Sequence, residues 1–193
     1  MKGMRPLTKD EVKLISDSFS GKFEHRDRAL FLLGVKSGFR ITELLSLKIG
    51  DIVDNGKMVD RVHVSRANMK KKVEGRSVIL HPEAKEALRI WIGELKDMGY
   101  MAKDDFIFQS RKGGNKAISR VGAWQILNAA AEGLEIGNIG THSMRKTFAN
   151  NVHDNMGNDI VKTQRALGHK NINSTVSYLS FREEDIDEAI LNC

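Results

Sequence analysis

Helix start and stop signals follow one another along most of this chain, and only one stretch interrupts them. The Thr8-Lys9-Asp10-Glu11 run is a capping box, in which the Thr8 hydroxyl and the Glu11 carboxylate each accept a backbone N–H. A strongly apolar helix over about 25–37 then meets Gly38, a residue that readily adopts the left-handed conformation at a helix end. These signals predict a mainly helical fold.

Further helices are expected from the same signals. A short one covers 42–47, and four longer ones start at Pro82, Ser119, Thr141 and near Asp159, the last of them stopping at Gly168. In the helix after Thr141, apolar side chains recur every four residues and predict a buried stripe, formed by Met144, Phe148 and Val152.

Residues 51–80 have a different character. The run 58–64 alternates between apolar and polar residues, and 76–80 is a second β-type run. The connection between them, residues 66–75, is basic and contains Lys70, Lys71 and Lys72. We therefore expect a small antiparallel sheet with a cationic hairpin tip. The fold class predicted for the whole chain is mainly α with a minor β element.

The length and composition favour one soluble domain over residues 1–193. No apolar run approaches the roughly 18 residues that span a bilayer, and the N-terminus has no signal-peptide pattern. The single cysteine, Cys193, cannot form an internal disulfide. His25, His63, His81 and His153 lack metal-ligand spacing, so we expect no metal site. A cytoplasmic protein without membrane contact is the simplest interpretation.

The net charge of +6 understates how basic most of the chain is. Residues 183–193 hold five carboxylates and no Lys or Arg, so the preceding 182 residues hold all 31 basic side chains and only 20 acidic ones. A basic body favours a polyanionic partner such as nucleic acid, although many basic proteins bind none.

Two arginines stand where a phosphate clamp could form. His142 and Arg145 are three residues apart on an expected helix, so their side chains share a face. Arg40 lies at a turn between two expected helices, and Glu43 could orient its guanidinium, whose rigid fork suits bidentate phosphate binding. Taken one at a time, a surface His–Arg pair and a structural Arg–Glu pair are the simpler explanations.

Tyr178 and His169 are the next candidates. The chain has two tyrosines, and a phenol with an unperturbed pKa near 10 needs nearby cations or a base to act as a nucleophile. Tyr178 could equally be a half-buried core residue. His169 directly follows Gly168, which lets a histidine project from a helix end. Each signal is weak alone, and their order along the chain gives them weight.

Three motifs in that order resemble the catalytic domain of the tyrosine recombinases, the phage-integrase family. The first-arginine motif corresponds to residues 38–45, the His-x-x-Arg box to residues 142–149, and the closing Leu-Gly-His motif to residues 167–169, with Tyr178 nine residues after the histidine. The resemblance runs from about Thr8 to Glu188. It implies a helical fold with a three-stranded antiparallel sheet, and DNA strand exchange that uses neither metal nor cofactor.

The resemblance also implies a role for each candidate. Tyr178 would attack the scissile phosphate to give a 3′-phosphotyrosyl link, and Arg40 and Arg145 would bind the non-bridging oxygens. His142 would assist proton transfer and His169 would donate a hydrogen bond to the phosphate. Glu43 would brace the arginine side of the site.

The resemblance further implies a hairpin lysine that protonates the leaving 5′-oxygen. Its usual spacing from an arginine that opens the last strand, here Arg76, favours Lys71 and leaves Lys70 as a rival. The remaining basic candidates for contacts with the DNA backbone are Lys70, Lys72, Arg111 and Lys112.

Partners and alternatives follow from the same resemblance. Double-stranded DNA is the expected partner, with a homotetramer formed in synapsis and the segment 185–191 docking on a neighbouring subunit or on its own domain. An N-terminal DNA-clamping domain is expected to be absent, as in short members such as the fimbrial phase-switch invertases or in a truncated form. A non-catalytic DNA-binding module and a type IB topoisomerase are the competing functions.

Overall fold

The computed structural model describes residues 4–64, 76–179 and 190–192. The chain divides into two compact units, residues 1–148 and residues 149–193, and each is described by itself. The expectation of one domain over residues 1–193 stays a prediction. The hairpin-tip lysines Lys70, Lys71 and Lys72 lie outside the described residues, as does most of the segment 185–191.

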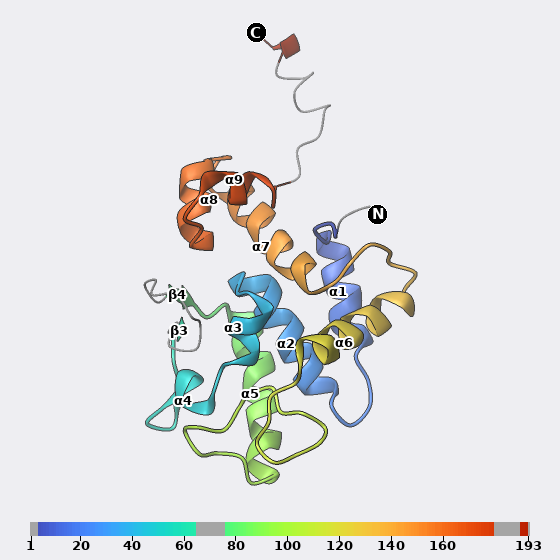
Figure 1. Cartoon of the computed structure of the whole chain (residues 1–193), viewed down its shortest axis with the longest axis vertical. Helices are drawn as coiled ribbons and strands as arrows, with labels where there is room; N and C mark the ends of the chain where they lie inside the picture. Colours follow the sequence, from blue (N-terminus) through green and yellow to red (C-terminus); the bar gives the residue numbers. More distant parts are fainter. Residues whose placement is uncertain (1–3, 65–75, 180–189, 193) are drawn as a thin grey trace. The chain divides into compact units, whose positions relative to one another are not determined.

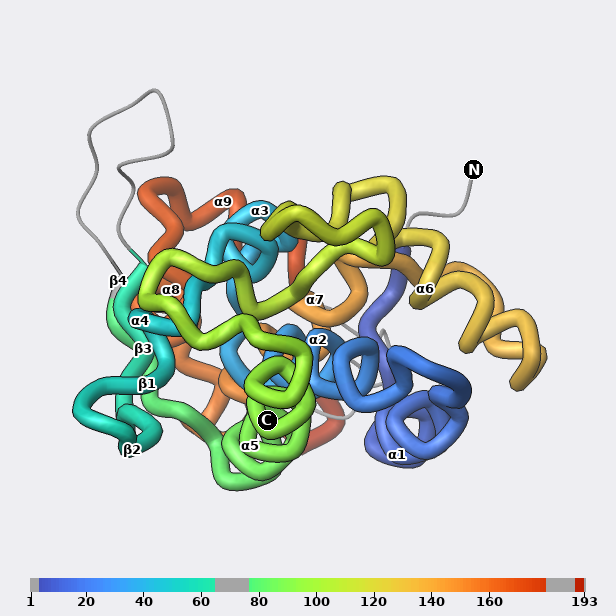
Figure 2. The backbone as a smooth tube through the Cα atoms, turned by 90° about the horizontal axis from the view of Figure 1, so that it is seen from below, coloured from blue at the N-terminus to red at the C-terminus, as the bar shows by residue number. Residues whose placement is uncertain are grey.

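The first unit is built around α2, Glu24–Ser37, which contacts α1 (Lys9–Ser18), α3 (Ile41–Leu45) and α5 (Pro82–Asp97). α2 and α5 run side by side (Figure 1 and Figure 2). Because α2 has neighbours on several sides, it is apolar around most of its circumference rather than along one stripe. Side chains at most 1% exposed at its core include Leu30, Phe31, Leu33 and, from α5, Trp91.

Two further helices complete the body of this unit. α6, Arg120–Glu132, packs against α1 and α3, and its cap is the expected Ser119, whose hydroxyl accepts from the Gly122 N–H at 3.0 Å. α4, Ile49–Ile52, is a single turn that the sequence analysis did not anticipate. The capping box at the start of α1 is confirmed, since Thr8 and Glu11 each accept the other's backbone N–H.

The β element consists of short antiparallel pairs. β3, Arg61–Val64, pairs with β4, Arg76–Ile79, which confirms the expected pairing of these two runs. β1, Val53–Asp54, pairs separately with β2, Lys57–Met58. In the described residues the β element is therefore two two-stranded pairs, in place of the single three-stranded sheet that the resemblance implied.

The break between the two pairs lies within the run that was expected to be one strand. The chain bends at Asp60, and the Val59 N–H donates to the Ile52 carbonyl at 2.9 Å instead of continuing a ladder. The Asp60 carbonyl accepts from the Leu80 N–H at 2.8 Å. These bonds satisfy the backbone at the bend, so the alternating pattern of 58–64 does not have to form one continuous strand.

α7, Thr141–Asn155, starts in the first unit and continues into the second. It begins at Thr141 itself, so Thr141 is not in the expected cap position; the Ser143 hydroxyl instead accepts from the Gly140 N–H at 3.1 Å. The stripe expected to be buried is only partly so. Met144 is 1% exposed, whereas Phe148 and Val152 are half-buried.

The second unit contains the end of α7, α8 (Ile160–Leu167) and α9 (Ile172–Val176), and α8 packs on α9. Asp159 caps α8, and Gly168, where the helix was expected to stop, ends it in the left-handed conformation at φ +63°. Among the described residues, no helix combines the length and apolar character needed to cross a bilayer.

Within the first unit, α7 lies close against the end of α2 because Gly34 in α2 and Gly38, the residue that follows α2, have no Cβ. A Cβ at Gly34 would collide with the Met144 side chain, and a Cβ at Gly38 would collide with the Phe148 ring. Gly38 also has φ +59°, a left-handed conformation that other residues adopt at a cost. It is therefore required both for the turn and for the close approach.

A substitution pair separates these two requirements. Gly21 has φ +82° but open space around its Cβ position, so Gly21→Ala is expected to lower the free energy of unfolding by about 1 kcal/mol. Gly38→Ala adds the Phe148 collision and is expected to cost about 2–5 kcal/mol. Urea unfolding of both variants measures the difference, and equal losses would show that the ring contact is unimportant.

Candidate active site

Arg145 connects α7 to the first-arginine segment. Its guanidinium donates through Nη1 to the carbonyl of Gly38, although the two residues are 107 positions apart in the sequence. Arg145 is 1% exposed, so a full positive charge is held inside the first unit next to the end of α2. Because Gly38 is only two residues before Arg40, this contact brings two of the three sequence motifs together.

Arg40 is held from one side by Glu43. One Glu43 oxygen accepts from Arg40 Nη1 at 3.0 Å, and the other accepts from the Arg40 backbone N–H at 2.7 Å. The Glu43 side chain is 6% exposed and the Arg40 side chain 35% exposed. The expected contact between this acid and this arginine is thus present. It fixes one edge of the guanidinium and leaves about a third of the side chain accessible to a ligand.

His142 occupies the first turn of α7, one helical turn before Arg145. Partial burial lowers the pKa of its imidazole below the ordinary value near 6.5, and the charges of Arg120, Arg145 and Lys146 lower this pKa further. Burial removes the hydration that the charged imidazole needs, and a fourth positive charge is disfavoured beside three existing ones. His142 therefore favours its neutral form, which can accept a proton.

Arg120 belongs to this cationic group, although no pattern in the sequence predicted it. Only the preceding Ser119 was expected to matter, as a helix cap, but Arg120, the first residue of α6, is close enough to influence His142. An exposed arginine directly after a helix cap is a weak signal, and no spacing rule connects it to α7.

In the second unit, His169 and Tyr178 are neighbours. Their ring centroids are 5.2 Å apart in an edge-to-face arrangement. His169 Nδ1 lies 3.0 Å from the Thr175 hydroxyl, and Thr175 is fully buried. The Gln164 side chain donates to the His169 carbonyl at 3.0 Å. His169 is thus held both at its imidazole ring and at its backbone.

The Tyr178 backbone is fixed in the same way. Its N–H donates to the Thr175 carbonyl at 2.9 Å, and its carbonyl accepts from the Asn150 side chain on α7 at 3.0 Å. Tyr178 itself is half-buried and follows α9 in a turn. No sequence signal pointed to Asn150 or Thr175, because their role depends on contacts that no local spacing rule predicts.

The remaining predicted residues fall outside these two groups. Lys71 and its neighbours are not among the described residues. Lys112 is exposed, and the Arg111 guanidinium lies 5.6 Å from the Phe23 ring centroid. Within the part of the chain that the structure describes, no three His, Cys, Asp or Glu side chains gather as a metal site would require. The first unit thus holds Arg40, Glu43, His142 and Arg145, and the second holds His169 and Tyr178.

Comparisons with known proteins place the chain in a family. The family described as "Phage integrase family" matches residues 5–184. The "Probable integrase/recombinase YoeC" of Bacillus subtilis (strain 168) is 29% identical over 159 residues, covering 82% of this chain and 80% of that protein. The "Type 1 fimbriae regulatory protein FimE" of Escherichia coli (strain K12) is 31% identical over 185 residues, covering 92% and 86%.

Larger relatives match over only part of their length. The chain covers 56% of one tyrosine recombinase XerD and 52% of one XerC. The crystal structure of the XerH site-specific recombinase bound to palindromic difH substrate, a post-cleavage complex, matches with a TM-score of 0.75 at 23% identity, over 96% of this chain and 51% of that one. This likeness confirms the predicted fold class, a mainly helical protein with small antiparallel sheets.

The lowered pKa of His142 can be measured directly. In the free protein, NMR titration of this imidazole is expected to give a midpoint below 6.5, and Arg120→Gln is expected to raise it because one neighbouring positive charge is removed. Arg89→Gln is a matched control, since Arg89 pairs with Glu86 on α5. A midpoint that responds equally to both substitutions would contradict the local electrostatic cause.

Proposed function

Because this chain belongs to the phage integrase family, we propose that it carries out site-specific DNA recombination by cleaving and rejoining DNA through a 3′-phosphotyrosyl intermediate. The observation that carries the proposal is the contact between Arg145 and the Gly38 carbonyl, which gathers two arginines and a histidine in one unit. Buried or braced guanidinium groups are suited to a phosphate whose negative charge increases in the transition state.

Tyr178 is the proposed nucleophile. Its phenol oxygen forms a bond to the scissile phosphorus while the bond from phosphorus to the 5′-oxygen breaks. The phenol proton passes to His142, and a hairpin lysine, Lys71 or its rival Lys70, protonates the leaving 5′-oxygen. The reverse reaction with the 5′-hydroxyl of another strand rejoins the DNA. No external energy source is needed because the phosphotyrosine conserves the bond energy, and the proposed steps use neither metal nor cofactor.

The electrostatics of the first unit support the proton transfer. A histidine acts as a base only when it is neutral, and the pKa of His142 is lowered by burial and by three neighbouring cations. Arg40 and Arg145 are proposed to bind the non-bridging oxygens, and Glu43 keeps Arg40 aligned before the substrate arrives. His169 is proposed to donate a hydrogen bond to the same phosphate.

The proposed partner is double-stranded DNA, with a homotetramer forming in synapsis. The basic character of residues 1–182 supports DNA binding that weakens steeply with salt. Arg120, Arg111, Lys112 and the hairpin lysines are proposed to contact the DNA backbone. The relatives include integrases, a fimbriae regulatory protein and Xer recombinases, and integration, excision and inversion of DNA would all use the same proposed cleavage and rejoining steps.

A covalent selection tests the nucleophile and needs no defined target site. Wild-type protein is incubated with a pool of nicked random duplexes, denatured with SDS, and the DNA that stays attached to protein is recovered and sequenced. We expect adducts with the wild type and with Tyr100→Phe, and none with Tyr178→Phe, because Tyr100 and Tyr178 are the only two tyrosines.

Other outcomes identify the competing functions. DNA binding without any adduct would establish a non-catalytic DNA-binding module. Adducts without sequence enrichment, together with relaxation of supercoiled plasmid, would establish a type IB topoisomerase. Mapping of the adduct to Tyr100 would overturn the assignment of the nucleophile.

The role of Arg40 can be separated from its structural role. Arg40→Gln is expected to slow adduct formation at saturating DNA by about 10²–10³-fold. It also leaves the buried Glu43 carboxylate without its side-chain partner, which destabilises the fold by about 1–3 kcal/mol. The double variant Arg40→Gln/Glu43→Gln removes that buried charge. It is expected to recover most of the stability in urea unfolding but not the rate, and recovery of both would refute the phosphate role.

A further inference from the structure

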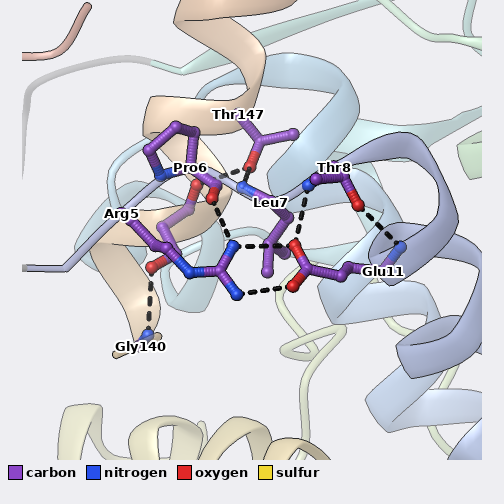
Figure 3. Close-up of polar contacts among 8 residues, drawn as sticks. Arg5, Pro6, Leu7, Thr8, Glu11, Gly140 and Thr147 are labelled. Atoms are coloured by element: carbon purple, nitrogen blue, oxygen red, sulfur yellow. Dashed lines mark hydrogen bonds and ion pairs between the residues drawn. The ribbon is translucent and has the colours of Figure 1, made fainter. Parts of the chain in front are cut away.

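The N-terminal segment Met4–Thr8, here called the strap, is fastened across the start of α7 (Figure 3). The Leu7 N–H donates to the Thr147 hydroxyl at 2.8 Å, and both residues are buried. The Lys146 ammonium donates to the Met4 carbonyl at 2.7 Å. Consecutive residues of α7 therefore bind the strap on both sides of Pro6.

A second set of bonds locks the strap in its conformation. The Arg5 backbone N–H donates to the Asn138 carbonyl at 3.1 Å, just before α7. The Arg5 guanidinium donates to both Glu11 oxygens and to the Pro6 carbonyl, so it closes a loop between the strap and α1 (Figure 3). This pairing lowers the pKa of Glu11 to about 2, and the carboxylate stays ionised at any working pH.

The strap contacts α7 on sides of the helix other than the face that carries His142 and Arg145. At 100° per residue, His142 and Arg145 share one face, and Lys146 flanks that face on one side. Phe148 flanks it on the other side, where its ring lies against Gly38 at the end of α2. Thr147 lies at the back of the helix, against the strap. The start of α7 is thus held between α2 and the strap, with the proposed catalytic face between them.

We propose that the strap positions α7 for strand cleavage, with Thr147, Arg5 and Glu11 acting as positioning residues for His142 and Arg145. This inference rests on the proposed function. Its physical basis is that a phosphate-binding arginine and a general base must be held to a fraction of an ångström, and a shift of about 1 Å can cost as much as 10² in rate. The strap also fixes Lys146, one of the cations beside His142.

Thr147 offers a matched pair of substitutions. Thr147→Val keeps the volume and removes the hydroxyl that accepts from the Leu7 N–H, whereas Thr147→Ser keeps the hydroxyl. Glu11→Gln is a second, independent test. Its amide oxygen can still accept from the Thr8 N–H, so the cap of α1 is kept while the ion pair with Arg5 is lost. Ile92→Val, in the core on α5, serves as a control for general loss of stability.

For each variant, three quantities are measured: the rate of covalent adduct formation at saturating DNA selected with the wild type, the Kd for that DNA, and the Tm. Thr147→Val is expected to slow cleavage by about tenfold or more with Kd changed by less than about twofold, and Glu11→Gln to slow it in the same direction. Thr147→Ser is expected to restore most of the rate. Ile92→Val is expected to lower the Tm and leave the cleavage rate unchanged.

The outcomes distinguish the two proposals. If wild-type protein forms no adduct, the proposed function fails. If wild-type protein forms adducts and Thr147→Val and Glu11→Gln cleave at the wild-type rate, the positioning role of the strap is refuted. It is equally refuted if Ile92→Val slows cleavage as much as Thr147→Val at a comparable Tm, or if the loss appears only in Kd.

Discussion

The hydrogen bond from Arg145 to the Gly38 carbonyl is the contact on which the chemistry proposed for the first unit depends. It requires a glycine at position 38, because the carbonyl is presented by a left-handed turn and because the Phe148 ring leaves no room for a Cβ. It also requires a buried guanidinium, which is costly unless it is well bonded. The left-handed turn, the close approach of α7 and the hydrogen bond to the buried Arg145 charge therefore all depend on Gly38.

The residues around this contact form a cationic site, and the phosphate proposed as its ligand would neutralise that charge. Arg145 is buried, Arg40 is braced by the Glu43 carboxylate, and the pKa of His142 is lowered by burial and by its cationic neighbours. Such an arrangement disfavours a further cation, and it is suited to the phosphodiester that we propose as its ligand. The strap is hydrogen-bonded to the helix that carries two of these groups, and this contact is the basis of the positioning role proposed for it.

Local signals predicted much of this architecture. The capping box at Thr8, the helix ends at Gly38 and Gly168 and the pairing of β3 with β4 follow from short-range backbone chemistry and were confirmed. The run 58–64 was predicted to be one strand and is broken at Asp60, because hydrogen bonds to distant backbone groups outweigh alternation over so short a stretch. A helix cap at Thr141 was also predicted, but the helix begins one residue earlier than that cap would allow.

The sequence by itself determined the family and which residue types are available for catalysis, because spacing within each motif is a local property. It could not determine that Thr147 would hold the Leu7 backbone, that Arg120 would lie near His142, or that Thr175 would hold His169. These contacts join segments that are separated by helices or turns, and their existence depends on how apolar faces pack. Only the tertiary structure decides which polar groups that packing brings within hydrogen-bonding distance.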